Sequence, residues 1–263
     1  IAHHLIDRIL KKTDWEIVSL DRLDFSGNLN RLKEVVDSYP TVEQKRVKVV
    51  HHDLKAEINP QIKSAIGPIN FIAHLAAGAH VDRSIDNSLP FVQSNIIGTY
   101  NLLEISRKHW EKMKSPRKDS FRFLHVSTDE VFGSLGKTGR FSEVTPYNPR
   151  SPYAASKASS DHLVNAWHHT YKLPVVITNC SNNYGPWQYL EKLIPTIIIK
   201  ALSEESIPIY GDGRNIRDWL FVEDHVEAIL LVASRGHLGE SYCIGGCLLY
   251  TSDAADEEDS VDL

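Results

Sequence analysis

The feature that most constrains the fold is an alternation of short apolar runs with longer amphipathic segments. The short runs are continuously apolar, as is typical of parallel strands that are covered on both faces. Helical segments between them indicate an α/β fold with a doubly wound parallel sheet. The predicted strands are residues 16–20, 46–50, 71–75, 121–126 and 174–178, and the predicted helices are residues 2–11, 28–38, 89–109 and 154–171.

The pattern loosens after Tyr184, where Gly185 and Pro186 interrupt the chain. Helices are predicted beyond this point over 192–202 and 222–235, and a strand over 207–210. We therefore expect a larger domain (1–184), a smaller lobe (185–246) and a tail (247–263). Residues 251–263 carry six acidic residues and no basic one, a composition that predicts disorder.

Composition excludes several classes of protein. The formal net charge is −5 and basic residues are scattered, which argues against a nucleic-acid partner. No apolar stretch is long enough to span a membrane. The three cysteines form neither a disulfide framework nor a zinc motif, which favours a reducing, cytoplasmic compartment. Neighbouring histidines (51–52 and 168–169) diverge on a strand or a helix, so we expect no metal site.

Tyr153 and Lys157 are candidate catalytic residues. They are four residues apart where Ser151 and Pro152 begin a predicted helix, so they share a face. A lysine ammonium beside a tyrosine hydroxyl stabilises the phenolate, which makes tyrosine a usable base near neutral pH. The alternative is an ordinary surface pair.

Asp129 and Glu130 directly follow a predicted buried strand. Ligands of open α/β sheets bind at the carboxyl ends of the strands. Two adjacent carboxyls there can act as an acid and a base if their surroundings separate their pKa values. The alternative is a solvated turn.

Two further carboxylates end strands, and one arginine lies in a glycine-rich segment. Asp21 could bind the hydroxyls of an adenosine ribose, which favours NAD over NADP, and Asp53 could contact the adenine. Their alternatives are turn or capping roles. Arg217 could hold a diphosphate, or it could pair with Asp218 or Asp224.

Together these motifs resemble the extended short-chain dehydrogenase/reductase family, and within it the dTDP-glucose 4,6-dehydratases. Within that family, the adjacent acids Asp129 and Glu130 (the acid pair) favour a dehydratase over an epimerase. The segments that carry the resemblance are residues 19–23, 26–29, 75–77, 80–85, 95–99, 125–133, 151–157, 180–186, 191–195 and 211–224.

The resemblance implies a Rossmann-type sheet with a smaller C-terminal substrate lobe, and a mechanism. Tyr153, assisted by Lys157, would remove the 4-hydroxyl proton of a nucleotide-linked hexose while hydride leaves C4 for NAD. Glu130 would take the C5 proton, Asp129 would protonate the departing 6-hydroxyl, and Thr128 would position the sugar. Hydride then returns to C6, which yields a 4-keto-6-deoxy sugar.

The same resemblance implies binding residues and a homodimer. Helices 89–109 and 154–171 resemble those that pair at the dimer interface of this family. The alternative is that their apolar stripes face the sheet. The residues implied for NAD are Asp21, Asp53, Leu54, Ala76, Ala77, Ser94, Tyr153, Lys157 and Asn183. Those implied for the nucleotide sugar are Thr128, Asn182, Lys192, Leu193, Pro208, Tyr210 and Arg217.

The chain also departs from the family pattern. Ile1 and Ala2 stand where the family's first strand and glycine-rich turn end, and the resemblance stops after Gly246. We therefore expect a chain truncated at both ends, with a non-family acidic tail, that binds NAD poorly. Two other functions stay open: a nucleotide-sugar epimerase or decarboxylase, and a non-catalytic remnant.

Overall fold

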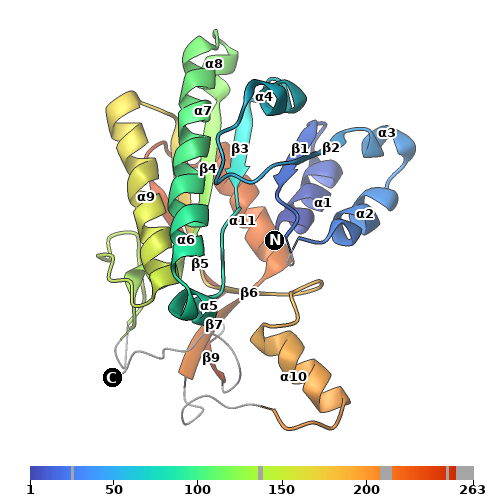
Figure 1. Cartoon of the computed structure of the whole chain (residues 1–263), viewed down its shortest axis with the longest axis vertical. Coiled ribbons are helices and arrows are strands. Elements are labelled where there is room, and N and C mark those ends of the chain that lie inside the picture. The colour runs from blue at the N-terminus through green and yellow to red at the C-terminus, as the bar shows by residue number, and fades with distance from the viewer. Residues whose placement is uncertain (25–26, 136–138, 208–214, 247–248, 253–263) are drawn as a thin grey trace.

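The protein has an α/β fold in which parallel sheets are flanked by helices, as the sequence predicted (Figure 1). The computed structural model describes residues 1–24, 27–135, 139–207, 215–246 and 249–252. Four parallel strands form the largest sheet, in the order β3-β4-β5-β8, and β1 and β2 form a second parallel sheet. Their bounds are β1 Ile17–Asp21, β2 Val47–His51, β3 Phe71–His74, β4 Arg122–Thr128, β5 Val175–Cys180 and β8 Ser241–Ile244.

The five strands predicted before residue 180 are confirmed within two residues at each end. The predicted helix over 89–109 is instead three consecutive segments that include a π-helical stretch, η1. The other predicted helices are confirmed. The helices are α1 Ala2–Lys12, α2 Leu29–Asp37, α3 Thr41–Gln44, α4 Pro60–Ile66, α5 Val81–Asp86, α6 Leu89–Phe91, η1 Val92–Ile97, α7 Gly98–Lys112, α8 Arg117–Ser120, η2 Asp129–Phe132, α9 Pro152–Tyr171, α10 Leu193–Leu202 and α11 Val222–Arg235.

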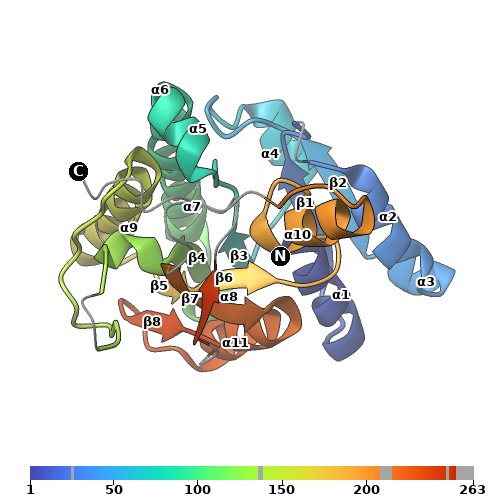
Figure 2. The same ribbon diagram turned by 90° about the horizontal axis from the view of Figure 1, so that it is seen from below.

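Helices cover both faces of the larger sheet. α7 and α9 lie side by side on one face, and α11 lies on the other (Figures 1 and 2). Because successive residues of a strand point to opposite faces, Phe123 of β4 packs under α7 and α9 while Leu124 packs towards α11. Both are fully buried, which explains why this strand is apolar without alternation.

The two parallel sheets are separate at β1 and β3, which share no ladder among the described residues. Helix α1 joins the two halves by packing on both α2 and α11, and Arg8 of α1 pairs with Glu227 of α11. The rings of Trp15 and Phe71, which precede β1 and begin β3, lie 5.7 Å apart. A cavity opens beyond the carboxyl ends of β1 and β3.

The C-terminal lobe contains a third, mixed sheet that the sequence did not predict. β6 Asn182–Tyr184 pairs in parallel with β7 Asn215–Phe221, and β9 Leu249–Ser252 pairs with β7 antiparallel. The predicted tail therefore contains a strand, and its residues 247–248 and 253–263 lie outside the described residues. Of the predicted strand 207–210, Ile207 is not in a strand and the rest is outside the described residues. Among the helices that the structure describes, none has both the length and the apolar character needed to span a bilayer.

A matched pair of leucines tests the assignment of the core. Leu103 of α7 is fully buried, whereas Leu202 of α10 is 81% exposed. We expect Leu103→Ala to lower the free energy of unfolding by about 2–5 kcal/mol, through lost burial and a residual cavity. Leu202→Ala should change it by about 0.5 kcal/mol or less. Chemical denaturation of both variants makes the comparison, and equal effects would contradict the packing described.

Candidate active site

The acid pair stands on a short turn at the carboxyl end of β4. Thr128 ends the strand, and its hydroxyl accepts a hydrogen bond from the Glu130 amide (3.3 Å) and donates one to Asp129 Oδ1 (3.2 Å). Val131 and Phe132 are buried and anchor η2 against α9. Asp129 and Glu130 are therefore held half-buried at the sheet edge where ligands of such folds bind.

Gly133 fixes the direction in which the chain leaves this turn. Its φ of +83° lies in the left-handed region, and an added Cβ would collide with the carbonyl oxygen of Asn148. The Asn148 amide in turn donates to the Val131 carbonyl oxygen (2.9 Å). The turn that carries the two acids, Asp129–Phe132 (the acid turn), is thus attached to the loop that leads into α9.

Helix α9 places Tyr153 and Lys157. Ser151 caps the helix by accepting from the Ala154 amide (3.1 Å), and Ser84 accepts from the Tyr153 amide (3.0 Å). Tyr153 is 8% exposed and Lys157 is 4% exposed. Lys157 Nζ donates to the carbonyl oxygen of Val126 in β4 (2.9 Å). Burial lowers the pKa of Lys157, and the carboxylate of Asp161 partly opposes this shift.

Asp161 was missed by sequence reasoning, although it joins several elements of the site. Its carboxylate is fully buried, and Oδ2 accepts hydrogen bonds from Ser127 Oγ (2.8 Å), Tyr147 Oη (3.0 Å) and Asn179 Nδ2 (3.3 Å). The available signal was its spacing: it lies four residues after Lys157, on the same helical face.

Asn95 of η1 was also missed. Its amide nitrogen donates to Ser156 Oγ (2.8 Å) and to the Gly78 carbonyl oxygen (3.0 Å), and its Oδ1 accepts from the Gly78 amide (2.7 Å). It therefore joins the turn after β3 to α9 beside Lys157. The sequence carried no clear signal for it, because Asn95 follows two other polar residues in η1.

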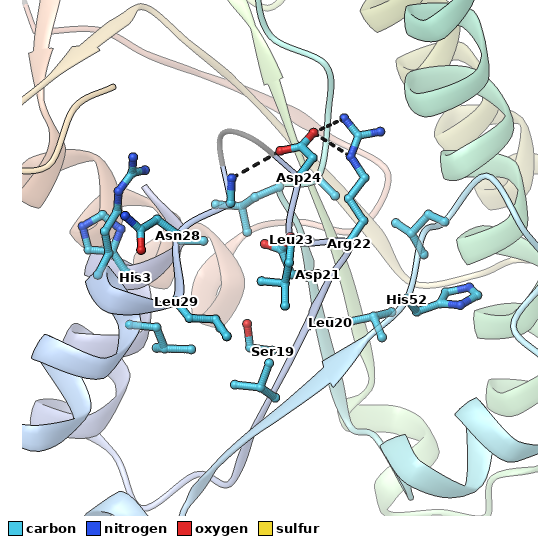
Figure 3. Close-up of a pocket in the computed structure, with 18 of the residues that line it drawn as sticks. His3, Ser19, Leu20, Asp21, Arg22, Leu23, Asp24, Asn28, Leu29 and His52 are labelled. Atoms are coloured by element: carbon cyan, nitrogen blue, oxygen red, sulfur yellow. Dashed lines mark hydrogen bonds and ion pairs between the residues drawn. The ribbon is translucent and has the colours of Figure 1, made fainter. Parts of the chain in front are cut away.

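A cavity of about 280 Å³ opens where β1, β2 and β3 end (Figure 3). At its wall, Asp21 accepts a hydrogen bond from the Leu23 amide (2.7 Å). Although burial alone would raise the pKa of Asp53, the amide and ammonium of Lys55 hold it below its ordinary value. Six residues predicted to bind a cofactor line this cavity: Asp21, Asp53, Leu54, Ala76, Ala77 and Ser94.

The other three predicted cofactor residues, Tyr153, Lys157 and Asn183, do not line the cavity. Asn183 lies on β6, where its Oδ1 is 2.6 Å from His225 Nδ1 and its amide donates to the Ser181 carbonyl oxygen. Burial lowers the pKa of His225 to about 4, so its ring is neutral near pH 7 and Nδ1–H can donate to Asn183.

Of the predicted substrate residues that the structure describes, Thr128 ends β4 and the other four lie in the C-terminal lobe. Asn182 of β6 is paired with Trp219 of β7, and Trp219 packs against the buried Leu193. Lys192 Nζ donates to the Ala79 carbonyl oxygen (3.1 Å), which joins the lobe to the loop after β3. Arg217 lies on β7 and donates to the Ile216 carbonyl oxygen (3.3 Å). Pro208 and Tyr210 lie outside the described residues.

Within the described parts of the chain, no group of three or more histidine, cysteine, aspartate or glutamate side chains is placed to hold a metal ion.

Comparisons with known proteins place the chain in a family. A family model described as GDP-mannose 4,6 dehydratase matches residues 1–258, and the chain belongs to this family. The dTDP-glucose 4,6-dehydratase of Xanthomonas campestris pv. campestris (strain B100) is 50% identical over 235 residues, which cover 88% of this chain and 64% of that protein. The dTDP-glucose 4,6-dehydratase of Neisseria meningitidis serogroup B is 49% identical, with 94% of this chain and 68% of that protein covered.

A solved structure agrees with these relatives. The dTDP-glucose 4,6-dehydratase from Bacillus anthracis, in complex with NAD, superposes with a TM-score of 0.80 and 40% identity over 94% of this chain and 73% of that one. The resemblance inferred from the sequence motifs is confirmed. The chain spans 64% of the length of the Xanthomonas relative.

The buried imidazole of His125 gives the fold a pH dependence. His125 Nε2 lies 3.2 Å from Asp161 Oδ1. Burial, together with the charge of Lys157, lowers the pKa of His125 to about 4, although Asp161 opposes the shift. The unfolded chain takes up this proton near the ordinary value of 6.5, so protonation favours unfolding at pH values between the two.

We expect this histidine to remove about 2 kcal/mol of stability between pH 7 and pH 4.5. His125→Gln should flatten the dependence of the free energy of unfolding on pH by that amount, as measured by chemical denaturation across this range. Ser127→Ala is the control, because it removes another neighbour of Asp161 but no titrating ring. A slope that is the same in His125→Gln as in the wild type would contradict this assignment.

Proposed function

We propose that the protein to which this chain belongs is a dTDP-glucose 4,6-dehydratase, an NAD-dependent lyase that forms a 4-keto-6-deoxy sugar. The observation that carries the proposal is the packing of the acid turn, Asp129–Phe132, against α9, which bears Tyr153 and Lys157. Both lie at the carboxyl-end side of β4, on the same side as the cavity. The identity of about 50% to dTDP-glucose 4,6-dehydratases supports the same function.

The cavity fits the adenosine half of NAD. It has a carboxylate, Asp21, at the end of β1 for the ribose hydroxyls and apolar walls from Leu54, Ala76 and Ala77. When bound, NAD supplies the reversible two-electron oxidation of the sugar carbon. Tyr153, Lys157 and Asn183, which lie outside the cavity, would contact the remaining part of the cofactor.

The residues of the chain supply the proton transfers. Tyr153 accepts the proton of the sugar 4-hydroxyl, and the buried ammonium of Lys157 favours its phenolate. Glu130 removes the C5 proton, and Asp129 protonates the departing 6-hydroxyl. Thr128, whose hydroxyl bonds the Asp129 carboxylate and the Glu130 backbone amide, positions the 4-hydroxyl. Two adjacent acids suit an elimination, in which one proton leaves and another is added.

The C-terminal lobe would hold the nucleotide diphosphate. Lys192 and Arg217 supply positive charge for phosphates. Leu193 follows Lys192 at the start of α10, and Asn182 of β6 pairs with Trp219, two residues after Arg217. Pro208 and Tyr210 are assigned to the same site from the family resemblance. We also propose a division after residue 184 into a NAD-binding domain (1–184), from which Thr128 and Asn182 also reach the sugar nucleotide, and a substrate lobe (185–246). The tail (247–263) would take no part in binding, although its strand β9 pairs with β7.

We also propose that the protein forms a homodimer and that it works in a reducing, cytoplasmic compartment. On α7 and α9, which lie side by side (Figure 1), Tyr100 and Tyr171 are each more than 40% exposed and flank Trp167. Exposed aromatic side chains of this kind are enriched at protein interfaces.

Cys180 and Cys243 are free thiols, which supports a reducing compartment.

Product analysis tests the function. With NAD and dTDP-glucose, the protein should form a 4-keto-6-deoxy sugar, and Glu130→Gln should lower its rate of formation about 10²–10⁴-fold through loss of the base. Glu34→Gln, an exposed change on α2, is the control and should leave the rate unchanged. A 4-epimer without the keto product would indicate an epimerase, and no conversion would indicate a non-catalytic remnant.

A further inference from the structure

Arg22 and Asp24 form an ion pair at the wall of the cavity, directly after β1 (Figure 3). Arg22 Nε and Nη2 lie 2.8 Å and 2.5 Å from Asp24 Oδ2, and Nη1 donates to Ser94 Oγ (3.1 Å). All three guanidinium nitrogens are therefore engaged. The two side chains are only 32% and 25% exposed, so solvent screens this pair less than an ordinary surface pair.

The local backbone holds the pair in place. Leu23, between the two charged residues, has a φ of +52°, and this left-handed turn brings Asp24 back towards Arg22. The Leu23 amide donates to Asp21 Oδ1, and the Gly27 amide donates to Asp24 Oδ1 (3.2 Å). A Cβ on Gly27 would lie 2.9 Å from the Leu23 Cα, so this turn requires glycine there.

The Arg22–Asp24 pair lies next to the proposed ribose site, so it can affect which adenosine ligand the cavity binds. Arg22 is adjacent to Asp21, the residue proposed to bind the ribose hydroxyls. An arginine beside that position is the usual ligand of a 2′-phosphate, because its fork matches phosphate oxygens. In this cavity the fork is occupied by Asp24 and Ser94, and Asp24 adds a second carboxylate near Asp21.

We propose that Asp24 is a cofactor-specificity residue that occupies Arg22 and thereby makes the cavity reject adenosine phosphorylated on its 2′-hydroxyl. Asp21 alone would leave a neighbouring arginine available to a 2′-phosphate. With Asp24 present, a 2′-phosphate meets two carboxylates and an arginine whose charge is already neutralised. The inference rests on the proposed function, since it takes the cavity as an adenosine site.

Paired ligands that differ only in the 2′-phosphate test the inference. Residues 1–263 are titrated calorimetrically at millimolar concentrations with 5′-AMP and adenosine 2′,5′-bisphosphate, and with NAD and NADP. The wild type should prefer the ligand without the 2′-phosphate in each pair. Asp24→Asn removes the charge but keeps an oxygen for the Gly27 amide. It should shift each affinity ratio roughly tenfold or more towards the 2′-phosphorylated ligand, as Arg22 is released.

Three further variants make the result specific. Asp24→Ser should shift the ratio in the same direction, and it provides a second variant if Asp24→Asn folds poorly. Adding Arg22→Ala to Asp24→Asn should remove the gain, because the released guanidinium is its source. Asp37→Asn, which removes an equal charge from the exposed pair with Lys33, should leave the ratio unchanged.

The outcomes separate the inference from the proposed function. If the wild type prefers 5′-AMP and NAD but both Asp24 variants keep its ratio, the inference is wrong and the adenosine site stands. If the folded wild type, checked by circular dichroism, binds neither 5′-AMP nor NAD, the adenosine site is wrong and the inference fails with it.

Discussion

The buried carboxylate of Asp161 is the interaction on which the site most depends. A fully buried carboxylate is costly unless hydrogen-bond donors surround it. Here a single oxygen accepts from Ser127 on β4, Asn179 on β5 and Tyr147 in the loop before α9. These donors come from three elements that are distant in sequence, so their common acceptor fixes the ends of two strands relative to the helix.

The positions of the candidate site residues follow from these hydrogen bonds to Asp161. Ser127 immediately precedes Thr128, whose hydroxyl orients the acid turn. One turn earlier on α9, Lys157 reaches the backbone of β4, and the negative charge of Asp161 supports its protonated form. Asn179 also donates to the Thr128 carbonyl oxygen (3.2 Å). The carboxyl end of β4 is therefore held from both sides, which is the preorganisation that the proposed catalysis needs.

Sequence patterns predicted the parts of the fold that local rules determine. The five early strands were predicted because each is a continuous apolar run, and α9 because a serine and a proline mark its start. Asp21 and Asp53 were recognised because they lie at, or just beyond, the ends of strands. The strands β6, β7, β8 and β9 were not predicted, since they are short or polar and depend on pairing between distant segments.

Long-range contacts explain what the sequence did not reveal at the site. Asp161 and Asn95 look like ordinary helix residues until tertiary packing buries them among donors and acceptors from other elements. The Arg22–Asp24 pair depends on the left-handed backbone of Leu23, a conformation that a leucine does not signal. Residues on strand ends are therefore easier to predict than residues that hold those ends together.

Hydrogen exchange in the Asp161→Ala variant tests most directly whether this carboxylate holds the site. Exchange should accelerate at least roughly tenfold in residues 127–132 and 147–148 because the donors lose their acceptor. Exchange in β2, which lies in the other parallel sheet, should change little. Unchanged exchange in residues 127–132, in a variant that is still folded, would contradict the account.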